Sequence, residues 1–195
     1  MSDTLLFVYG SLISSEARTL TGQAGQVWPA RANGLKRFWN AFADLGYAVL
    51  GLIPEVTATC NGLLVELSEE ELSKFDQKEH RYRRSTLSAA RIEHGGRQIR
   101  SSERVWIYMP HKVIAPTDAY PIVQSYIDVV LSGCMEVSEE FAVEFIRTTV
   151  GWERPWINDR GTEQYQRALR QVQCGDLIDE LLKAHCPKGL THRYP

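Results

Sequence analysis

The stretch CNGLLVELSEEELSKFDQKEHRYRR, residues 60–84, carries the clearest change of secondary structure in the chain. Its first part, NGLLVEL, is an apolar run with the length and character of a buried strand. Ser68 then stands three residues before Glu71, which is the capping-box pattern that opens a helix. The apolar face of this helix would carry Leu72 and Phe75. We expect a strand, a short helix and then another strand.

Strand patterns continue on both sides of this stretch. Residues 5–9 form a short apolar run that ends at Gly10, and residues 26–67 contain strand-like runs separated by Gly, Asn and Pro. Farther along the chain, two strand-like runs, YRRSTLSAARI and ERVWIYM, lie on either side of the turn 93–98, which contains Gly95 and Gly96. This arrangement predicts a β-hairpin around the glycine pair.

Helical patterns dominate the C-terminal third. Near the N-terminus, residues 14–22 are expected to be helical. The other helices are expected farther along the chain: over 121–133, from Ser138 onward, over 162–173 and over 176–185. Pro121 would lie in the first turn of its helix and Gly133 at the end of it. Strands that come first and helices that come later are typical of the α+β class. We expect a single domain, residues 1–195, with a core over 1–133 and a helical extension over 134–195.

Composition and charge restrict the class of protein. The chain has 195 residues, 44% of them hydrophobic and 24% charged, which are ordinary values for a globular domain. The formal net charge of −2 argues against nucleic acid as the main partner, and we interpret the basic cluster Arg81–Arg84 as a solvated face. No run of apolar residues approaches the ~20 that a membrane span needs. The acidic N-terminus and the four widely spaced cysteines predict a cytoplasmic protein with reduced thiols.

The run FVYGSL, Phe7 to Leu12, ends a predicted strand on Gly and Ser and raises the question of what its loop holds. The G-x-S-x-G frame of a nucleophile elbow is absent, and Gly-Ser alone matches neither phosphate-binding fingerprint. The histidines His80, His94 and His111 are too far apart to predict a local metal cluster. Glu79 follows the predicted helix, where its charged neighbours alone favour an exposed, ion-paired surface residue.

Taken together, these motifs resemble the gamma-glutamylcyclotransferase superfamily. The resemblance rests on Tyr9-Gly10-Ser11-Leu12, then on NGLLVEL, and then on Glu79, Tyr82 and Arg83, in this order and spacing. The resemblance implies a mixed sheet, partly closed into a barrel, with helices packed around it. It also implies an enzyme that releases 5-oxoproline from a gamma-glutamyl amide, amine or peptide, as in glutathione metabolism. Val8 stands where the ChaC-type branch has a glycine, so the resemblance is closer to the general and gamma-glutamylamine branches.

The resemblance also implies the site residues. Glu79 matches the catalytic glutamate of the family. The residues implied to bind substrate are Tyr9, Gly10, Ser11, Leu12, Tyr82, Tyr108 and Tyr126. The backbone N–H groups of Gly10, Ser11 and Leu12 would hold the glutamyl end of the substrate, because successive N–H groups form an anion-binding concavity. A glycine is expected at position 10 so that the backbone can approach the ligand closely.

The chemistry of this reaction needs few groups from the protein. The α-amine of the substrate is the nucleophile, and such ring closures reach effective molarities of about 10⁵–10⁸ M, so neither a metal nor another cofactor is expected. A base is needed because an α-ammonium group with a pKa of about 8 is mostly protonated at neutral pH. The expected partner is a small gamma-glutamyl molecule, with neither nucleic acid nor membrane, and the expected assembly is a monomer or homodimer.

Two other functions remain open from the sequence. The same pocket could bind a gamma-glutamyl or other carboxylate ligand without turnover, or it could form or cleave a different amide on a glutamyl-tagged metabolite. The aromatic and polar run GWERPWINDRG, residues 151–161, is expected to tie the helical extension onto the core, and a lid or specificity loop is the alternative.

Overall fold

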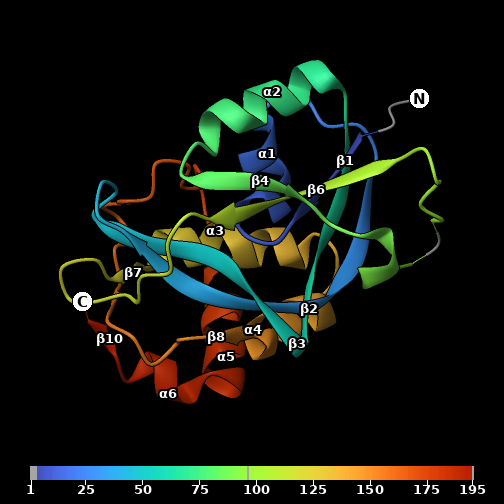
Figure 1. Cartoon of the computed structure of the whole chain (residues 1–195). Coiled ribbons are helices and arrows are strands. Elements are labelled where there is room, and N and C mark those ends of the chain that lie inside the picture. The colour runs from blue at the N-terminus through green and yellow to red at the C-terminus, as the bar shows by residue number, and fades with distance from the viewer. Residues whose placement is uncertain (1–3, 96, 195) are drawn as a thin grey trace.

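The protein, described here by a computed structural model over residues 4–95 and 97–194, combines one mixed β-sheet with helices that pack against it (Figure 1). The strands are β1 (Thr4–Val8), β2 (Val27–Phe42), β3 (Tyr47–Leu67), β4 (Tyr82–Thr86), β5 (Ile92–His94), β6 (Arg104–Pro110), β7 (Ile122–Val123), β8 (Thr149–Val150), β9 (Trp156–Ile157) and β10 (Arg193–Tyr194). The helices are α1 (Ser15–Thr21), α2 (Glu69–Lys78), α3 (Gln124–Met135), α4 (Glu139–Thr148), α5 (Gly175–His185) and α6 (Pro187–Leu190). Two 3₁₀ turns, η1 (Ser11–Ile13) and η2 (Ala89–Arg91), complete the set. The predicted α+β class is confirmed.

Strand β1 lies in the interior of the sheet and determines where its C-terminal end points. It pairs antiparallel with β3 and parallel with β6, so that Leu6 lies opposite Val65 on one side and Trp106 on the other. The pairing order through the described strands is β10-β9-β7-β3-β1-β6-β4, and β2 joins this path through β3. All five residues of β1 are buried, so the loop that follows, from Tyr9 onward, starts from a fixed position in the core.

The two longest strands, β2 and β3, form a curved hairpin that wraps around one side of the molecule (Figure 1). Pairing runs from Phe42 opposite Tyr47 to Val27 opposite Val65, with a shift in register between Asn33 and Leu35. Gly34, at this bulge, has a φ of 75°, which a residue with a side chain rarely adopts. The sheet is strongly curved and mostly open.

Capping and burial confirm helix α2 as the sequence predicts it. The Ser68 hydroxyl accepts a hydrogen bond from the N–H of Glu71 at 3.1 Å, and Leu72 and Phe75 are fully buried. The hairpin predicted around Gly95 and Gly96 is confirmed in the antiparallel pairing of its outer strands, but its connection is longer than a turn at the glycine pair. Gly96 itself lies outside the described residues. Strand β5 pairs with β2, whereas β4 pairs antiparallel with β6 across the longer connection 87–103.

Helix α3 begins and ends later than the sequence predicts. Ile122 and Val123 extend the sheet as β7, and the helix continues past Gly133 to Met135. Gly133 therefore lies inside the helix. A Cβ atom at this position would come within 2.3 Å of the backbone nitrogen of Ser14. The glycine allows α3 to pack directly against the backbone that follows η1, and this packing explains its place in the sequence.

The C-terminal extension contributes side chains to the same hydrophobic cluster as the rest of the chain, including the fully buried Trp156 and Ile178. Helices α4 and α5 confirm two of the predicted helices. The helix predicted over 162–173 is wrong, because this segment is irregular. Within the described part of the chain, no helix is long and apolar enough to cross a membrane.

Candidate active site

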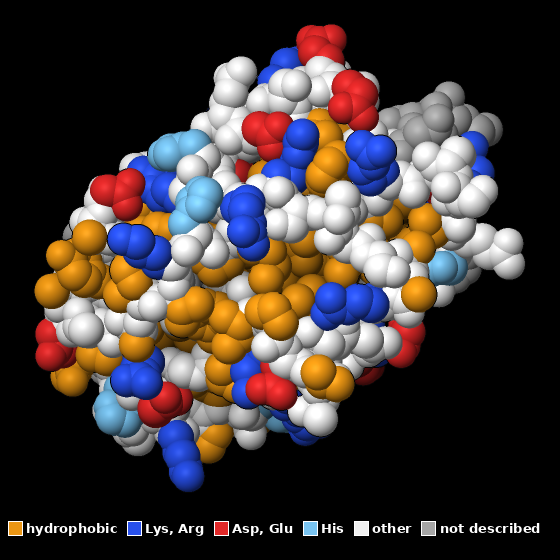
Figure 2. All heavy atoms as spheres, viewed as in Figure 1, with side chains coloured by type: hydrophobic (Ala, Val, Ile, Leu, Met, Phe, Trp, Pro, Cys, Tyr) orange, Lys and Arg blue, Asp and Glu red, His pale blue; other side chains and the backbone are white. Residues whose placement is uncertain are grey.

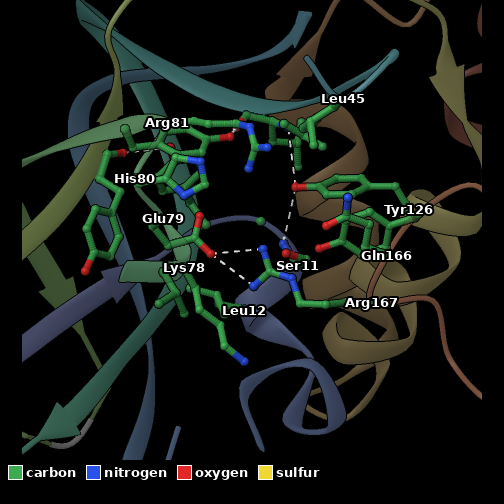
Figure 3. A pocket seen from close by; sticks show the side chains of 18 of the residues that line it. Ser11, Leu12, Leu45, Lys78, Glu79, His80, Arg81, Tyr126, Gln166 and Arg167 are labelled. Carbon is green, nitrogen blue, oxygen red and sulfur yellow. Dashed lines mark hydrogen bonds and ion pairs between the residues drawn. The ribbon is translucent and has the colours of Figure 1, made fainter. Parts of the chain in front are cut away.

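A cavity of about 410 Å³ opens where the end of β1 meets the end of α2 (Figure 3). Its walls come from the loop after β1, from β3, from the turn between α2 and β4, and from residues 165–167 of the C-terminal extension. The predicted site residues all line it: Tyr9, Gly10, Ser11, Leu12, Glu79, Tyr82, Tyr108 and Tyr126. The fold thus brings together residues that are separated by up to 117 positions in the chain.

Glu79 is turned into this cavity by the helix that it ends. Its backbone N–H donates to the carbonyl of Phe75 at 2.8 Å, so Glu79 follows Phe75 by one helical turn on the same face. Because that face is buried, the side chain of Glu79 points inward and is only 9% exposed. The sequence around Glu79 favoured an exposed surface residue, and the structure shows a buried one instead.

A cation from the C-terminal extension contacts Glu79. Both terminal nitrogens of Arg167 donate to Oε1 of Glu79 at 3.0 Å, and Nη1 also donates to the hydroxyl of Thr21 at 3.2 Å (Figure 3). Burial by itself lowers the pKa of Arg167, but the neighbouring Tyr165 and the Glu79 carboxylate raise it above its ordinary value. Arg167 is therefore charged at any physiological pH, and the carboxylate beside it has a permanent partner.

The tyrosine hydroxyls of the predicted site stabilise the cavity wall. Tyr9 donates to the carbonyl of Tyr108 at 2.7 Å, and Tyr82 donates to the carbonyl of Leu50 at 2.8 Å. The hydroxyl of Tyr126 accepts from the N–H groups of Leu50 at 3.3 Å and Ser11 at 3.4 Å. Burial raises the pKa of these three hydroxyls, so they stay protonated. Direct contact of these tyrosines with substrate stays a prediction.

Tyr108 has a different hydroxyl partner from the other three tyrosines. Its hydroxyl donates to Oδ1 of Asp76 at 2.8 Å, and the other oxygen of Asp76 accepts from Arg84 at 2.6 Å. These bonds connect α2 to β6 and β4, the two strands beside it. The turn that carries Glu79 is therefore braced from both ends.

Gly10 has a structural neighbour that the sequence could not reveal. Its φ of −135° lies outside the left-handed region, so backbone angle alone does not call for glycine. A Cβ atom at position 10 would lie 2.8 Å from the hydroxyl of Tyr126. Glycine at this position lets the end of β1 approach Tyr126 on α3. Its predicted approach to a ligand is an additional role that stays a prediction.

Two residues from the extension were missed by the sequence analysis, Tyr165 and Arg167. Tyr165 is 5% exposed, and its ring packs edge-on against Tyr126 at a centroid distance of 4.7 Å. Both residues lie in the segment whose spacing predicts an amphipathic helix, and no motif marks them. The remaining signal, a cation among polar residues, is too common in sequences to identify a site.

Hydrogen bonds from side chains fix the position of this irregular segment. The carboxylate of Asp159 accepts from the N–H and hydroxyl of Ser125 at 2.7 and 2.6 Å and from the N–H of Gln164 at 2.7 Å. The hydroxyl of Ser125 accepts from the N–H of Tyr165 at 3.2 Å. Ser125 lies in the first turn of α3, so these bonds hold Tyr165 beside the start of that helix. The loop 151–161 ties the extension to α3, as expected, and its continuation reaches the cavity.

Cations outnumber carboxylates among the described residues that line the cavity. Among the described residues that line the cavity, Glu79 is the one carboxylate, whereas Lys78, Arg81 and Arg167 are cations. Arg81 is paired with Asp44 at 2.6 Å. Figure 2 shows Lys, Arg and His side chains, with acidic side chains among them, around the end of α2 and the turn between β2 and β3. In the part of the chain described, His, Cys, Asp and Glu form no group of three or more that could hold a metal ion, and independence from cofactors stays a prediction.

Comparison with known proteins identifies the family. A model of the family "Gamma-glutamyl cyclotransferase, AIG2-like" matches residues 6–126, well over half of the chain. A comparison with curated protein sequences found no match. The match ends within α3, so α4, α5 and the segment that carries Tyr165 and Arg167 lie beyond it.

Solved structures share the fold at low sequence identity. A structure titled gamma-glutamyl cyclotransferase is 15% identical, with a TM-score of 0.59, and the alignment covers 91% of this chain and 98% of that one. YkqA from Bacillus subtilis is 18% identical, with a TM-score of 0.53 and coverage of 71% and 51%. An uncharacterized protein from Homo sapiens is 13% identical, with a TM-score of 0.50 and coverage of 92% and 97%. The chain belongs to the AIG2-like gamma-glutamyl cyclotransferase family.

Proposed function

We propose that this protein is a gamma-glutamylcyclotransferase that releases 5-oxoproline from a gamma-glutamyl amide, amine or peptide, with Glu79 as the general acid and base. The observation that carries the proposal is the position of Glu79, the one carboxylate among the described lining residues of a cavity that the family motifs surround. The four free cysteine thiols fit the cytoplasmic location that we propose with it.

The reaction follows from the geometry of Glu79. Hydrogen bonds from Arg167 occupy Oε1, so in our proposal Oε2 takes a proton from the α-ammonium group of the substrate. The freed amine attacks the γ-carbonyl carbon and forms the new ring C–N bond. The ring nitrogen then loses its second proton, the original amide C–N bond breaks, and Glu79 returns one proton to the departing nitrogen. The amine that leaves takes up the other proton as an ammonium group. No atom of the protein enters a covalent bond, and no water is consumed.

The loop after β1 is held in a form that suits its proposed role. Nη1 of Arg18, which is buried, donates to the carbonyl oxygens of Leu12 and Ile13 at 2.8 and 2.5 Å. These bonds hold the turn η1 through its carbonyl groups and leave its N–H groups uninvolved. We propose that the N–H groups of Gly10, Ser11 and Leu12 bind the glutamyl part of the substrate, as the family resemblance implies, and that they do so at the γ-carbonyl oxygen, where negative charge develops during ring closure. The Ser11 N–H would exchange its 3.4 Å bond to Tyr126 for this oxygen.

The test is a panel of gamma-glutamyl compounds that includes glutathione, gamma-glutamyl amino acids and gamma-glutamylamines. Each is incubated with the protein, and 5-oxoproline and the freed amine are quantified. We expect stoichiometric release of both products from at least one compound, and the panel identifies the substrate. Saturable binding without release would support the non-catalytic alternative. Release of the amine without 5-oxoproline would support the other amide chemistry and contradict the proposal.

A further inference from the structure

We propose that the C-terminal extension completes the active site: the guanidinium of Arg167 and the hydroxyl of Tyr165 bind the α-carboxylate of the substrate. This inference rests on the proposed function and deepens it, because it assigns the recognition of one substrate group to residues beyond the family match. Arg167 and Tyr165 would be binding residues, and the substrate class would be restricted to compounds with a free α-carboxylate.

The hydrogen bonds of Arg167 leave one side of its guanidinium available. A guanidinium has five N–H donors, and three bonds to described residues are made here, all from the two terminal nitrogens. Glu79 receives two of them at the end of the group. The side formed by Nε–H and the second hydrogen of Nη2 makes no hydrogen bond to a described residue. This two-donor side has the geometry that binds a carboxylate through both oxygens.

The position of Arg167 beside Glu79 fits the α-carbon of a glutamyl group. The α-amine and the α-carboxylate of the substrate are attached to the same carbon atom. An amine that lies close enough to give Glu79 its proton therefore brings the carboxylate into the immediate neighbourhood of Glu79. Arg167, with both terminal nitrogens 3.0 Å from Oε1 of Glu79, is the cation in that neighbourhood. In Figure 3, Arg167 and Glu79 face each other beside Ser11.

The hydroxyl of Tyr165 provides an independent indication of a ligand. It is buried and makes no hydrogen bond of normal geometry to a described residue, with the side chain of Ser11 as its polar neighbour, and Tyr165 lines the cavity. A buried hydroxyl without such a bond is costly unless a ligand or water binds it. Burial raises the pKa of Tyr165 to about 12, so this hydroxyl remains a donor at neutral pH. A donor without a hydrogen bond of normal geometry, close to a cation with a free side, is suited to an anion.

The segment that presents these two residues is fixed before any ligand arrives. Asp159 and Ser125 hold its backbone, as described above, and Asp159 is only 2% exposed. Next to Asp159, Arg160 is bound by Asp128 at 2.6 Å and by Asp179 at 2.8 Å. Rigid supports of this kind reduce the entropy that a binding site loses when its ligand binds.

A substrate pair that differs only in the α-carboxylate tests the inference by turnover. The pair is a gamma-glutamyl methylamide and the corresponding 4-amino-N-methylbutanamide, which has the same amine and carbonyl and cyclises to 2-pyrrolidinone. Neither leaving group carries a carboxylate. In Arg167→Gln, we expect kcat/KM for the gamma-glutamyl compound to fall roughly 10- to 100-fold more than kcat/KM for its partner. Equal losses for both compounds would mean that Arg167 acts only through Glu79, and this result would overturn the inference.

Product binding tests the inference without turnover. Titration calorimetry with 5-oxoproline should show a Kd that rises roughly 10- to 100-fold in Arg167→Gln and less in Arg167→Lys, which keeps the charge. Tyr165→Phe should raise the Kd by a smaller factor. The affinity for 2-pyrrolidinone, which lacks the carboxylate, should not change. Arg170→Gln, an exposed arginine of the same segment, is the matched control, and thermal melts of each variant verify folding.

The two measurements separate this inference from the proposed function. Normal turnover with an unchanged preference between the two substrates would overturn the inference and leave the function intact. Binding of 5-oxoproline that depends on Arg167, in a protein that releases none from the panel, would overturn the function and support the inference. If Arg167→Gln binds 5-oxoproline normally and keeps the normal preference between the two substrates, the inference is overturned whatever the function is.

Discussion

The cavity has two halves that differ in how the sequence encodes them. One half comes from the N-terminal motif around Gly10 and from the end of α2 at Glu79, and the other comes from Tyr165 and Arg167 in the extension. The first half lies at the ends of a regular strand and a regular helix, whose apolar periodicity and capping residues are visible in the sequence. The second half lies on an irregular segment fixed by Asp159 and Ser125.

This difference shows which site residues sequence motifs can locate and which they cannot. A strand or helix places its final residue in a known direction, and the helical register from Phe75 explains why Glu79 is buried although its charged neighbours favoured an exposed residue. An irregular segment is placed by bonds between residues far apart in the chain, such as Asp159 with Ser125, and no local pattern announces them. The two halves should also respond differently to mutation. Changes in the first half should affect chemistry, and changes in the second should affect recognition and local stability.

The largest effect is expected in the first half, from Glu79→Gln. Glutamine preserves the shape of the side chain and removes the base, so the rate of 5-oxoproline release should fall about 10²- to 10⁴-fold. Steady-state kinetics on the best substrate of the panel measures this loss. Glu70→Gln, on the exposed side of the same helix, is the matched control and should keep full activity. A Glu79→Gln protein with nearly normal kcat would refute the proposed role of Glu79.

The next largest effect is expected from Gly10→Val, because even a Cβ atom would lie 2.8 Å from the hydroxyl of Tyr126. Overpacking of this kind typically costs about 1–3 kcal/mol of stability and displaces the backbone. Melting curves and 5-oxoproline release should both show a loss. Gly10→Ala tests the cause when it is made both in the normal protein and in a Tyr126→Phe background. Because the background lacks the hydroxyl, Gly10→Ala should cost less stability there. If the background has no effect, the contact with Tyr126 is not the reason for glycine.

In the second half, Asp159→Asn should loosen the segment that carries Tyr165 and Arg167. The amide can no longer accept from all three donors that Asp159 binds, so we expect a loss of about 1.5–3 kcal/mol in the free energy of unfolding. KM for the substrate should rise more than kcat falls, because recognition depends on this segment. Denaturant unfolding and kinetics measure the two effects, with the exposed Asp118→Asn as a control. An unchanged KM would contradict the prediction that Asp159 supports substrate recognition.

The smallest effect is expected from Ser11→Ala. This change removes a hydroxyl and leaves the backbone N–H groups of the loop in place, so it should cost at most about 0.5–1.5 kcal/mol of binding or activation free energy. Comparison with Gly10→Val in the same assay separates the contribution of the Ser11 hydroxyl from that of the loop backbone. If Ser11→Ala abolished turnover while 5-oxoproline still bound, Ser11 would be a nucleophile, and an acyl-enzyme would replace ring closure by the substrate amine.

The predictability of the fold follows the same division. The burial of β1, the capping box at Ser68 and the helix from Ser138 could be predicted because each depends on neighbouring residues. The partner of β5 could not, because the pairing of Ile92 with Ala32 spans 60 positions and competes with the nearer β6. Gly133 has the local appearance of a helix end, and only its contact with the backbone of Ser14 explains why it lies inside α3.

The site was predictable to the extent that its residues belong to motifs. All the residues that the resemblance implies line one cavity, whereas the ion pair between Arg167 and Glu79 joins positions 88 apart and has no pattern in the sequence. The role of a charged residue in an irregular segment can be inferred only from the residues that it contacts in the folded protein. For this reason the extension, which the family match leaves uncovered, needed the structure.

The most direct test of the central claim follows the fate of the γ-carbonyl carbon. The best gamma-glutamyl substrate is turned over in isotope-labelled water, and the product is identified by mass spectrometry. Our account predicts 5-oxoproline that contains no oxygen from the solvent, because the substrate amine attacks the carbonyl and water does not. An α-N-acetylated substrate, whose amine is blocked, should release nothing. Glutamate that carries labelled oxygen, or turnover of the blocked substrate, would contradict the account.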